Sequence, residues 1–359
     1  MAELLKDLYS KAFIKSLCCA VEKNYSSFDS VVFTKTVFSD EWASKELKAR
    51  MRHVSTTLYE CLPNNYEKSL RVLSKTSLQF DGLLHMVFPD YVEVYGLNDF
   101  DESVSALEYF TERSSSEFAV RPFIVKYPKQ MMAQMLKWTE SKNEHVRRLA
   151  SEGCRPRLPW AMALPEFKKD PSVVVRLLER LKDDDSEYVR RSVANNLNDI
   201  SKDHPDVLIE ISSQWIGTDL NRNGIIKHAC RTLLKAGDSR ALALFDLPPP
   251  KHVVVIDFKV DESVKLGGRL GFSFVLKTNK PQLGKLRVEY AMYFLKGNGT
   301  LSKKVFKISE SISGGQSKPV EKNYSFRPIS TRKYYIGNHR LSIIVNGHEL
   351  CSSSFSLIS

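Results

Sequence analysis

The sequence predicts an α plus β protein of two domains, an α-solenoid of helix pairs followed by an antiparallel β-sandwich. Apolar residues recur with a helical period up to residue 247 and with a period of two after residue 252. Three consecutive prolines at 248–250 separate the two patterns. A proline run cannot continue a helix and favours an extended, semi-rigid spacer. We therefore expect a helical domain at 1–247, a linker at 248–251 and a sandwich at 252–359.

Helix pairs are indicated by short amphipathic stretches that are joined by polar turns. Asp170-Pro171 is a favourable helix start, and the apolar residues that follow it fall on one helical face: Val174, Leu177, Leu178 and Leu181. The polar run 183–186 then separates this stretch from the next amphipathic one. Consecutive short helices with tight turns are typical of antiparallel helix pairs.

A repeated motif supports the solenoid. An apolar residue is followed by two basic or potentially basic residues in Val146-Arg147-Arg148, Val189-Arg190-Arg191 and Ile226-Lys227-His228. Their spacings of 43 and 37 residues are close to the roughly 40–47 residues of HEAT-type repeats. A solenoid presents equivalent positions along one curved surface, so we expect the basic pairs to form a ladder there.

The last third of the chain predicts an immunoglobulin-like sandwich. Alternating apolar residues mark seven short stretches, at 254–260, 270–276, 288–294, 306–308, 324–326, 341–345 and 351–357. Asn346-Gly347 between the last two is a strong hairpin-turn signal. Seven short strands in about 110 residues fit this fold. The region has no Cys…Trp…Cys pattern, so an antibody-type domain is excluded.

The basic charge of the protein is confined to that last third. Residues 251–359 contain 18 Lys and Arg against 7 Asp and Glu, which equals the net charge of +11 for the whole chain. A basic module joined to a neutral one suggests an accessory domain that grips a polyanion. The alternative is that the lysines only keep the sandwich soluble.

Several classes of protein are excluded by composition. No apolar run of about 18 residues predicts a membrane span, and the acidic start, Met1–Asp7, does not resemble a signal peptide. Neither the six cysteines nor the eight histidines show metal-ligand spacing, and no phosphate-binding loop motif occurs. We expect a cytoplasmic protein without metal or cofactor.

Two segments are richer in unusual residues than a structural helix pair requires. One is 117–128, and the other is 151–160, where Gly153, Pro156 and Pro159 end a helix and stiffen a loop. This loop presents a carboxylate, two arginines and an indole. From the residues alone, an inter-repeat connection with a core tryptophan and a paired acid explains it as well as a functional site does.

These segments resemble the AlkC family of bacterial alkylpurine DNA glycosylases. The similarity lies in Ser151–Trp160, in the Val146-Arg147-Arg148 helix before it and in Asn195–Asp199 at the end of the next repeat. The subgroup of that family with a C-terminal immunoglobulin-like domain has the architecture predicted here. The resemblance therefore covers essentially the whole chain.

The resemblance implies hydrolysis of the N-glycosidic bond of 3-methyladenine and related cationic bases in sharply bent duplex DNA, without a conventional base pocket. The implied catalytic residues are Asp199, which would serve the sugar and the water, Glu117 and Glu152, which would flank the cationic site, and Trp160. The implied DNA-binding residues are Arg121, Lys126, Arg147, Arg148, Arg155, Arg157, Arg190 and Arg191. The sandwich would clamp the duplex, and the enzyme would be a monomer without lyase activity.

Two other functions remain open at this stage. A non-catalytic nucleic-acid scaffold would gain nothing from Glu117, Glu152 and Asp199 near phosphates, since carboxylates repel them. A protein-interaction solenoid would need neither basic pairs in register nor a rigid Arg-Pro-Arg loop.

Overall fold

A computed structural model of the chain describes residues 4–39, 41–217 and 219–359. Its packing divides the chain into two compact units. The first comprises Met1–His204 and Gly217–Ala229, and the second comprises Pro205–Ile216 and Cys230–Ser359. No helix within the described ranges combines the length and the apolar character that crossing a bilayer requires.

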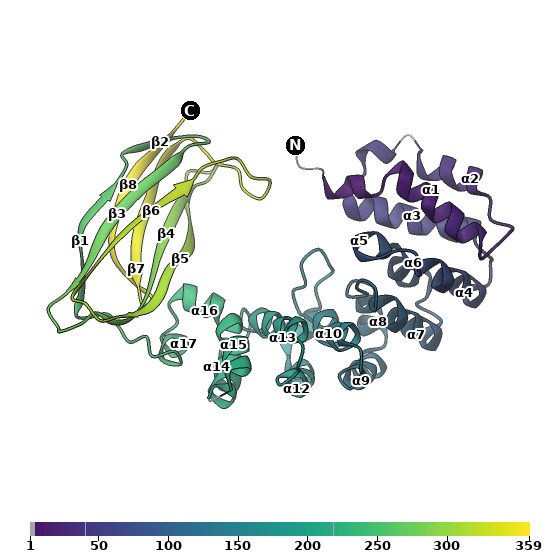
Figure 1. Cartoon of the computed structure of the whole chain (residues 1–359), viewed down its shortest axis with the longest axis horizontal. Helices are drawn as coiled ribbons and strands as arrows, with labels where there is room; N and C mark the ends of the chain where they lie inside the picture. The colour runs from purple at the N-terminus through teal and green to yellow at the C-terminus, as the bar shows by residue number, and fades with distance from the viewer. Residues whose placement is uncertain (1–3, 40, 218) are drawn as a thin grey trace. The chain divides into compact units, whose positions relative to one another are not determined.

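The first unit consists of helices, as predicted (Figure 1). Its first half contains η1 (Leu5–Leu8), α1 (Lys11–Glu22), α2 (Ser30–Val37), η2 (Trp42–Ser44), α3 (Leu47–Cys61), α4 (Tyr66–Ser77), α5 (Gly82–His85), α6 (Val87–Tyr95) and α7 (Phe100–Thr111). Its second half contains α8 (Val120–Lys126), α9 (Pro128–Trp138), α10 (Glu144–Gly153), α11 (Pro165–Lys169), α12 (Ser172–Leu181), α13 (Glu187–Ile200) and α15 (Leu220–Ala229).

Side-chain caps explain where several of these helices begin. Ser10, Asn65 and Asn143 each precede a helix and accept a hydrogen bond from a backbone N–H of its first turn. Such caps satisfy N–H groups that have no partner inside the helix. Asp170 accepts from the N–H of Ser172, so α12 starts one residue after Pro171.

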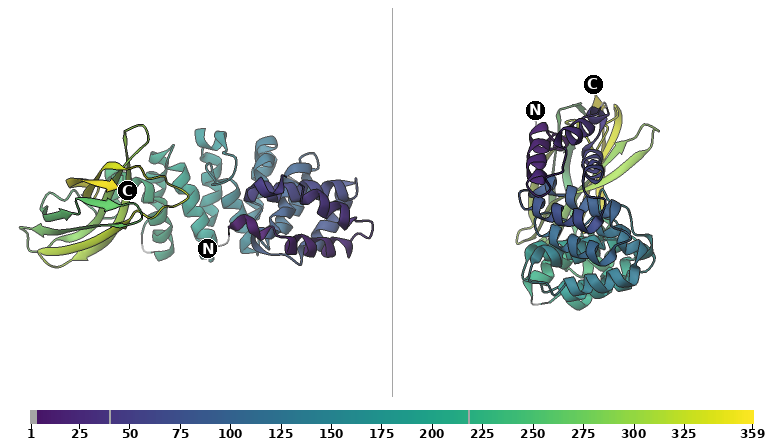
Figure 2. Two further views of the ribbon diagram at one scale, coloured as in Figure 1. Left: turned by 90° about the horizontal axis from the view of Figure 1, so that it is seen from above. Right: turned by 90° about the vertical axis from the view of Figure 1, so that its right-hand side faces the viewer.

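Stacked helix pairs form the second half of the unit. α10 packs against α13, and α13 packs against α15, while α9 and α12 form a second row. Seen from above, the helices from α9 to α13 run roughly parallel (Figure 2). The predicted repeat anchors Val146, Val189 and Ile226 are all buried, but Val146 and Val189 are the third residues of α10 and α13, whereas Ile226 is the seventh residue of α15. The helical-repeat architecture is therefore confirmed, and the third anchor lies about one turn further along its helix than predicted.

The second unit contains three helices and eight strands, all within described residues. They are α14 (Pro205–Trp215), α16 (Arg231–Ala236), α17 (Ser239–Ala243), β1 (Val253–Val260), β2 (Ser263–Lys265), β3 (Arg269–Thr278), β4 (Gly284–Leu295), β5 (Leu301–Ser313), β6 (Ser317–Ser325), β7 (Gly337–Val345) and β8 (His348–Ile358). The strands form a three-stranded sheet, β1-β3-β6, and a five-stranded sheet, β2-β8-β7-β4-β5. Their facing sides bury a common core that includes Phe274, Met292 and Leu341.

The predicted sandwich is thus confirmed, with differences in detail. The predicted hairpin turn is present, because Asn346 and Gly347 have φ values of 43° and 78° between β7 and β8. The sequence pattern missed β2, which is three residues long and has only Val264 buried. It also placed β5 and β6 too short, because Val305 is the only buried residue in the described parts of these two strands.

The proline run lies within the second unit rather than between the two units, with Pro248 and Pro249 exposed and Pro250 buried. Leu247 is buried, and the Asn346 side chain donates to the carbonyl of Pro248 at 2.8 Å. The β7–β8 turn also packs closely on α17, since a Cβ at Gly347 would lie 2.7 Å from Leu242 Cδ1. The prolines mark the change from helix to strand, but the last helices pack with the sandwich.

Candidate active site

The three predicted catalytic carboxylates lie on three different elements of the first unit. Glu117 is in the turn before α8, Glu152 is in the last turn of α10, and Asp199 is in the last turn of α13. Ion pairs connect all three, so the fold brings together carboxylates that are up to 82 positions apart in the sequence.

These carboxylates alternate with three cations in one continuous series. We call this series the acid–base chain, and its members in order are Glu117, Arg148, Glu152, Arg155, Asp199 and Lys202. Arg148 pairs with Glu117, and its Nη2 lies 3.4 Å from Glu152 Oε1. Arg155 donates from Nη1 to Glu152 Oε1 at 2.6 Å and from Nε to Asp199 Oδ2 at 2.8 Å. Lys202 Nζ ends the series, 2.9 Å from Asp199 Oδ1.

Hydroxyl groups complete the bonding of the central carboxylate. Ser192 Oγ donates to Glu152 Oε2 at 2.7 Å, and Ser151 Oγ donates in turn to Ser192 Oγ at 2.7 Å. Ser115 Oγ likewise donates to Glu117 Oε2 at 2.8 Å. Both Glu152 oxygens therefore have partners, and its position is determined from two helices. Preorganised charges of this kind stabilise a developing opposite charge without reorganising.

The carboxylates of the acid–base chain become more deeply buried from Glu117 to Asp199. The exposed fraction of the side chain falls from 15% at Glu117 to 6% at Glu152 and 2% at Asp199. Burial by itself lowers the pKa of Arg148, but the charges of Glu117 and Glu152 outweigh it and raise that pKa. The pKa of Arg155 is raised in the same way, against its burial, by Glu152 and Asp199. Both arginines are held as cations by the carboxylates that they connect.

The fourth predicted catalytic residue, Trp160, lies at the tip of the loop between α10 and α11. This loop rises above the row of helices directly after α10 (Figure 1). The Trp160 side chain is 65% exposed, which excludes the alternative that it is a core tryptophan. Its φ of 64° is left-handed, and that conformation costs a residue with a side chain about 1–2 kcal/mol.

Arg121, which was predicted to bind DNA, does not lie on the surface of the described structure. Its side chain is completely buried beneath the Trp160 loop, where Nη1 donates to the carbonyl of Gly153 at 2.8 Å and Nε donates to that of Met162 at 2.7 Å. Burial lowers the pKa of Arg121 to about 10. The guanidinium therefore fastens the two ends of the loop, a role that the sequence pattern did not indicate.

The first arginine of each repeated pair ties the repeat together. Arg147 Nη1 donates to the carbonyls of Ser141 and Lys142, six and five residues earlier. Arg190 Nη1 does the same with Asp184 and Asp185. Equivalent arginines thus hold equivalent turns, and Arg147 also forms a two-bond ion pair with Asp184 of the next repeat. These bonds give both Arg147 and Arg190 a structural role within the repeats.

The second residues of the pairs lie in different surroundings. Arg148 belongs to the acid–base chain, whereas Arg191 is exposed, and no partner for it is found among the described residues. Arg191 and His228 line a groove of about 390 Å³ between α13 and α15.

Of the remaining predicted residues, Arg157 pairs with Asp203 through two bonds of 2.9 and 2.6 Å, and exposed Lys126 contacts Asn98 at 2.7 Å.

Sequence reasoning missed three members of the site, Lys202, Ser192 and Ser115. Lys202 follows Asp199 by three residues at the end of α13, so its i, i+3 spacing was a signal that could have revealed it. Ser192 carries no such signal, because a serine between Val189 and Val193 is unremarkable in sequence.

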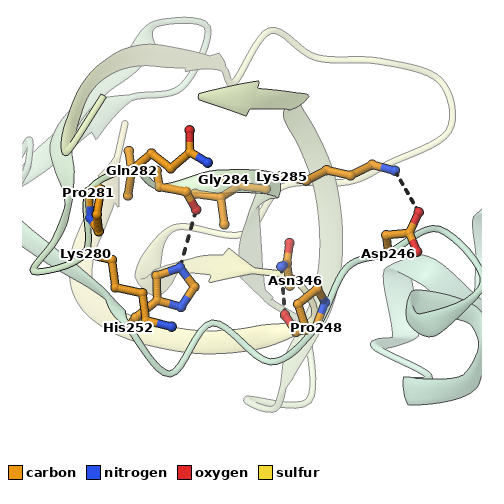
Figure 3. Close-up of a pocket in the computed structure, with 11 residues that line it drawn as sticks. Asp246, Pro248, His252, Lys280, Pro281, Gln282, Gly284, Lys285 and Asn346 are labelled. Carbon is orange, nitrogen blue, oxygen red and sulfur yellow. Dashed lines mark hydrogen bonds and ion pairs between the residues drawn. The ribbon is translucent and has the colours of Figure 1, made fainter. Parts of the chain in front are cut away.

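A second cavity is unrelated to this site. Figure 3 shows a pocket of about 450 Å³ in the second unit, lined by residues of the linker and the sandwich that include His252, Lys280 and Gln282. Lys285 and Asp246 face each other across its rim at 3.7 Å. It shares no residue with the acid–base chain.

Comparisons with known proteins agree with both units. Residues 113–212 match a family described as DNA alkylation repair enzyme, and residues 254–359 match the C-terminal Ig-like domain of the YhaZ proteins. The uncharacterized protein YhaZ of Bacillus subtilis is 46% identical over 355 residues, which is 98% of this chain and 99% of that protein.

A solved structure is similar over the same extent. It is the Pseudomonas fluorescens alkylpurine DNA glycosylase AlkC bound to DNA that contains an abasic site analog, with a TM-score of 0.95 and 35% identity. The similarity covers 99% of this chain and 100% of AlkC. The helical family match also includes every member of the acid–base chain. With both units and nearly the full length matched at these identities, the chain belongs to the AlkC/YhaZ family of DNA alkylation repair glycosylases.

Proposed function

We propose that this protein hydrolyses the N-glycosidic bond of cationic alkylated bases, chiefly 3-methyladenine, in bent duplex DNA. The observation that carries the proposal is the acid–base chain beneath the exposed Trp160 loop. Alkylation at N3 gives the purine a positive charge, so it leaves without a strong general acid. What the reaction needs is stabilisation of a positive sugar, and fixed carboxylates supply that.

The three carboxylates are given different tasks in this proposal. Asp199 stabilises the sugar cation and orients the attacking water, while Glu117 and Glu152 flank the cationic base. Lys202 covers Asp199 from the side that is open to solvent, since its side chain is 40% exposed. Approach of the sugar therefore requires Lys202 to swing aside, and a phosphate is a suitable new partner for it.

Trp160 provides selectivity for the charged base. Its exposed indole can lie against a cationic purine, and a cation over an indole face contributes about 0.5–2 kcal/mol. The side chain stands on a protruding loop rather than lining a closed pocket, which suits a base that is contacted within a bent duplex. In this proposal the enzyme acts as a monomer on double-stranded DNA and uses water as its nucleophile.

The test is incubation of the full-length protein with N-methylated duplex DNA and chromatographic identification of the released bases. Asp199→Asn keeps the shape of the side chain and removes its charge, so single-turnover excision should fall by about 100-fold or more. Affinity for an uncleavable duplex should hold or improve, because a carboxylate near phosphates is repulsive.

Controls separate catalysis from general charge effects. Asp185→Asn makes the same chemical change at an exposed turn of the same repeat and should keep the wild-type rate. Borohydride should trap no covalent protein–DNA adduct, because water and not a lysine attacks the sugar. Wild-type excision by Asp199→Asn would move the catalytic role to Glu117 or Glu152. Binding without any base release would favour a scaffold.

A further inference from the structure

Lys48 connects the N-terminal helices to the Trp160 loop. It is the second residue of α3 and lies 112 positions before Trp160, yet its Nζ donates a hydrogen bond to the Trp160 carbonyl at 2.6 Å. None of the residues predicted for the site lies in the first 110 positions, so this bond is a contact that the sequence did not indicate.

The same ammonium also touches the second segment of the site. Lys48 Nζ lies 4.3 Å from the centre of the Phe118 ring, and Phe118 follows the catalytic candidate Glu117 directly. A cation is attracted to the face of an aromatic ring at this distance. One half-buried side chain therefore bridges the turn that carries Glu117 and the loop that carries Trp160.

The tip of the loop needs such support. Its ends are fastened by Arg121 and by the bond from Leu164 N–H to the Pro156 carbonyl at 3.1 Å. Trp160 has a strained left-handed φ, and its indole is too exposed for packing to fix it. Because Lys48 binds the carbonyl of that same residue, it favours the peptide orientation that directs the indole.

The other charged groups near Lys48 already have stronger partners. Glu93 feels the Lys48 charge, but its pKa is raised, first by burial and then by the charge of Asp90. The direct partner of Glu93 is Arg52, whose Nη2 lies 2.7 Å from Glu93 Oε1. The Lys48 ammonium is thus directed at the loop and the ring rather than at a carboxylate.

We infer that Lys48 is a positioning residue, which holds the Trp160 loop in its working conformation from the N-terminal helices. The inference rests on the proposed function, in which Trp160 recognises the cationic base. Through Lys48, the helices before α8 contribute to selectivity without touching the acid–base chain.

The experiment compares Lys48→Met, Lys48→Arg and the control Lys15→Met in the full-length protein. Lys15 is an exposed lysine of α1, so its loss changes the net charge equally. Hydrogen–deuterium exchange of the 156–164 segment should quicken only in Lys48→Met. Single-turnover excision of 3-methyladenine by that variant should fall about 10-fold, the scale of losing the contact between the indole and the cationic base. Lys48→Arg, which keeps a donor, should restore most of both properties.

Other outcomes overturn the inference. Unchanged exchange of the loop in Lys48→Met would show that Lys48 does not position it. Equal loss of affinity for damaged and undamaged duplex, with an unchanged rate at saturation, would make Lys48 a phosphate contact. If the wild-type protein releases no methylated base, the proposed function fails, and the exchange data still decide whether Lys48 holds the loop.

Discussion

At the scale of single residues, Arg121 and Arg191 show how similar side chains acquire opposite tasks. Arg121 is fully buried against two carbonyl groups, whereas Arg191 is exposed beside the groove between α13 and α15. Arg191→Ala should weaken binding to damaged and undamaged duplex alike and reduce the salt slope by about 1, as expected of a phosphate contact. Equilibrium binding across a salt series measures both quantities.

Substitution of Arg121 should lower the stability of the fold rather than the affinity for DNA. Arg121→Met removes the donor to the buried carbonyl of Gly153, at a cost of about 1–3 kcal/mol, and the donor to the more exposed carbonyl of Met162. The salt slope of binding should stay at its wild-type value.

A loss of affinity for Arg191→Ala that is confined to damaged DNA would show that Arg191 recognises the lesion rather than a phosphate.

A buried histidine makes the helical unit sensitive to acid. His85 is inaccessible to solvent between Phe88 and Phe110, and burial lowers its pKa to about 4. The unfolded chain takes up this proton near pH 6.5, but the folded chain resists it. Stability is therefore complete above about pH 6.5 and declines toward pH 4, by up to about 1.4 kcal/mol per pH unit.

The prediction is that His85→Leu removes this contribution to the pH dependence. Urea unfolding followed by tryptophan fluorescence at pH 7.5 and 5.5 measures it, since all four tryptophans precede the sandwich. Replacing the exposed His348 with Gln should leave the pH dependence as it is. An undiminished loss of stability at pH 5.5 in His85→Leu would assign the effect to other groups.

At the scale of elements, the end of α10 sets the position of Glu152. Gly153 is the last residue of that helix, and a Cβ there would lie 2.6 Å from Val120 Cγ2 and 3.0 Å from Met135 Cε. Gly153→Ala should therefore push α10 away from α8 and α9, lower the stability by about 1–3 kcal/mol and slow excision by displacing Glu152.

The matched control for this packing argument is Gly224→Ala in α15. That glycine is also helical, but a Cβ there would meet nothing within 4 Å. The change should be neutral or stabilising by about 0.5–1 kcal/mol, because alanine favours the helix. Equal destabilisation by both substitutions would show that close packing at Gly153 is not the cause. Fluorescence-detected unfolding of the two variants compares them directly.

Whether a feature can be predicted from the sequence depends on whether neighbouring residues or distant residues determine it. The buried face of α12 and the Asn346-Gly347 turn follow from local patterns, and both were predicted correctly. The three acids were found through resemblance to a family rather than through local pattern. The roles of Arg121 and Lys48 depend on carbonyl groups 41 and 112 positions away, and no local pattern encodes such contacts.

At the scale of the whole molecule, the basic charge is distributed unevenly within the sandwich. The β6–β7 loop at 326–336 carries Arg327, Arg332 and Lys333 and no acidic residue. Arg327 and Lys333 are exposed, and Ile329 beside them is 47% exposed. The register of β3 with β6 places Lys277 opposite Ser317, which is the end of the sandwich away from this loop. We expect the loop end to hold DNA.

Removing the sandwich would be a poor test of this expectation, because α17 and the linker share its core and would be left exposed. The sharper test neutralises charges in the full chain. Arg327→Gln with Lys333→Gln should weaken duplex binding and reduce the salt slope by about 1.8, which is two phosphate contacts at about 0.9 each. Lys277→Gln with Lys280→Gln removes the same charge at the other end and should leave the slope nearly unchanged. Equal effects of the two pairs would mean that the sandwich contributes only its net charge, and that no particular end of it contacts the duplex.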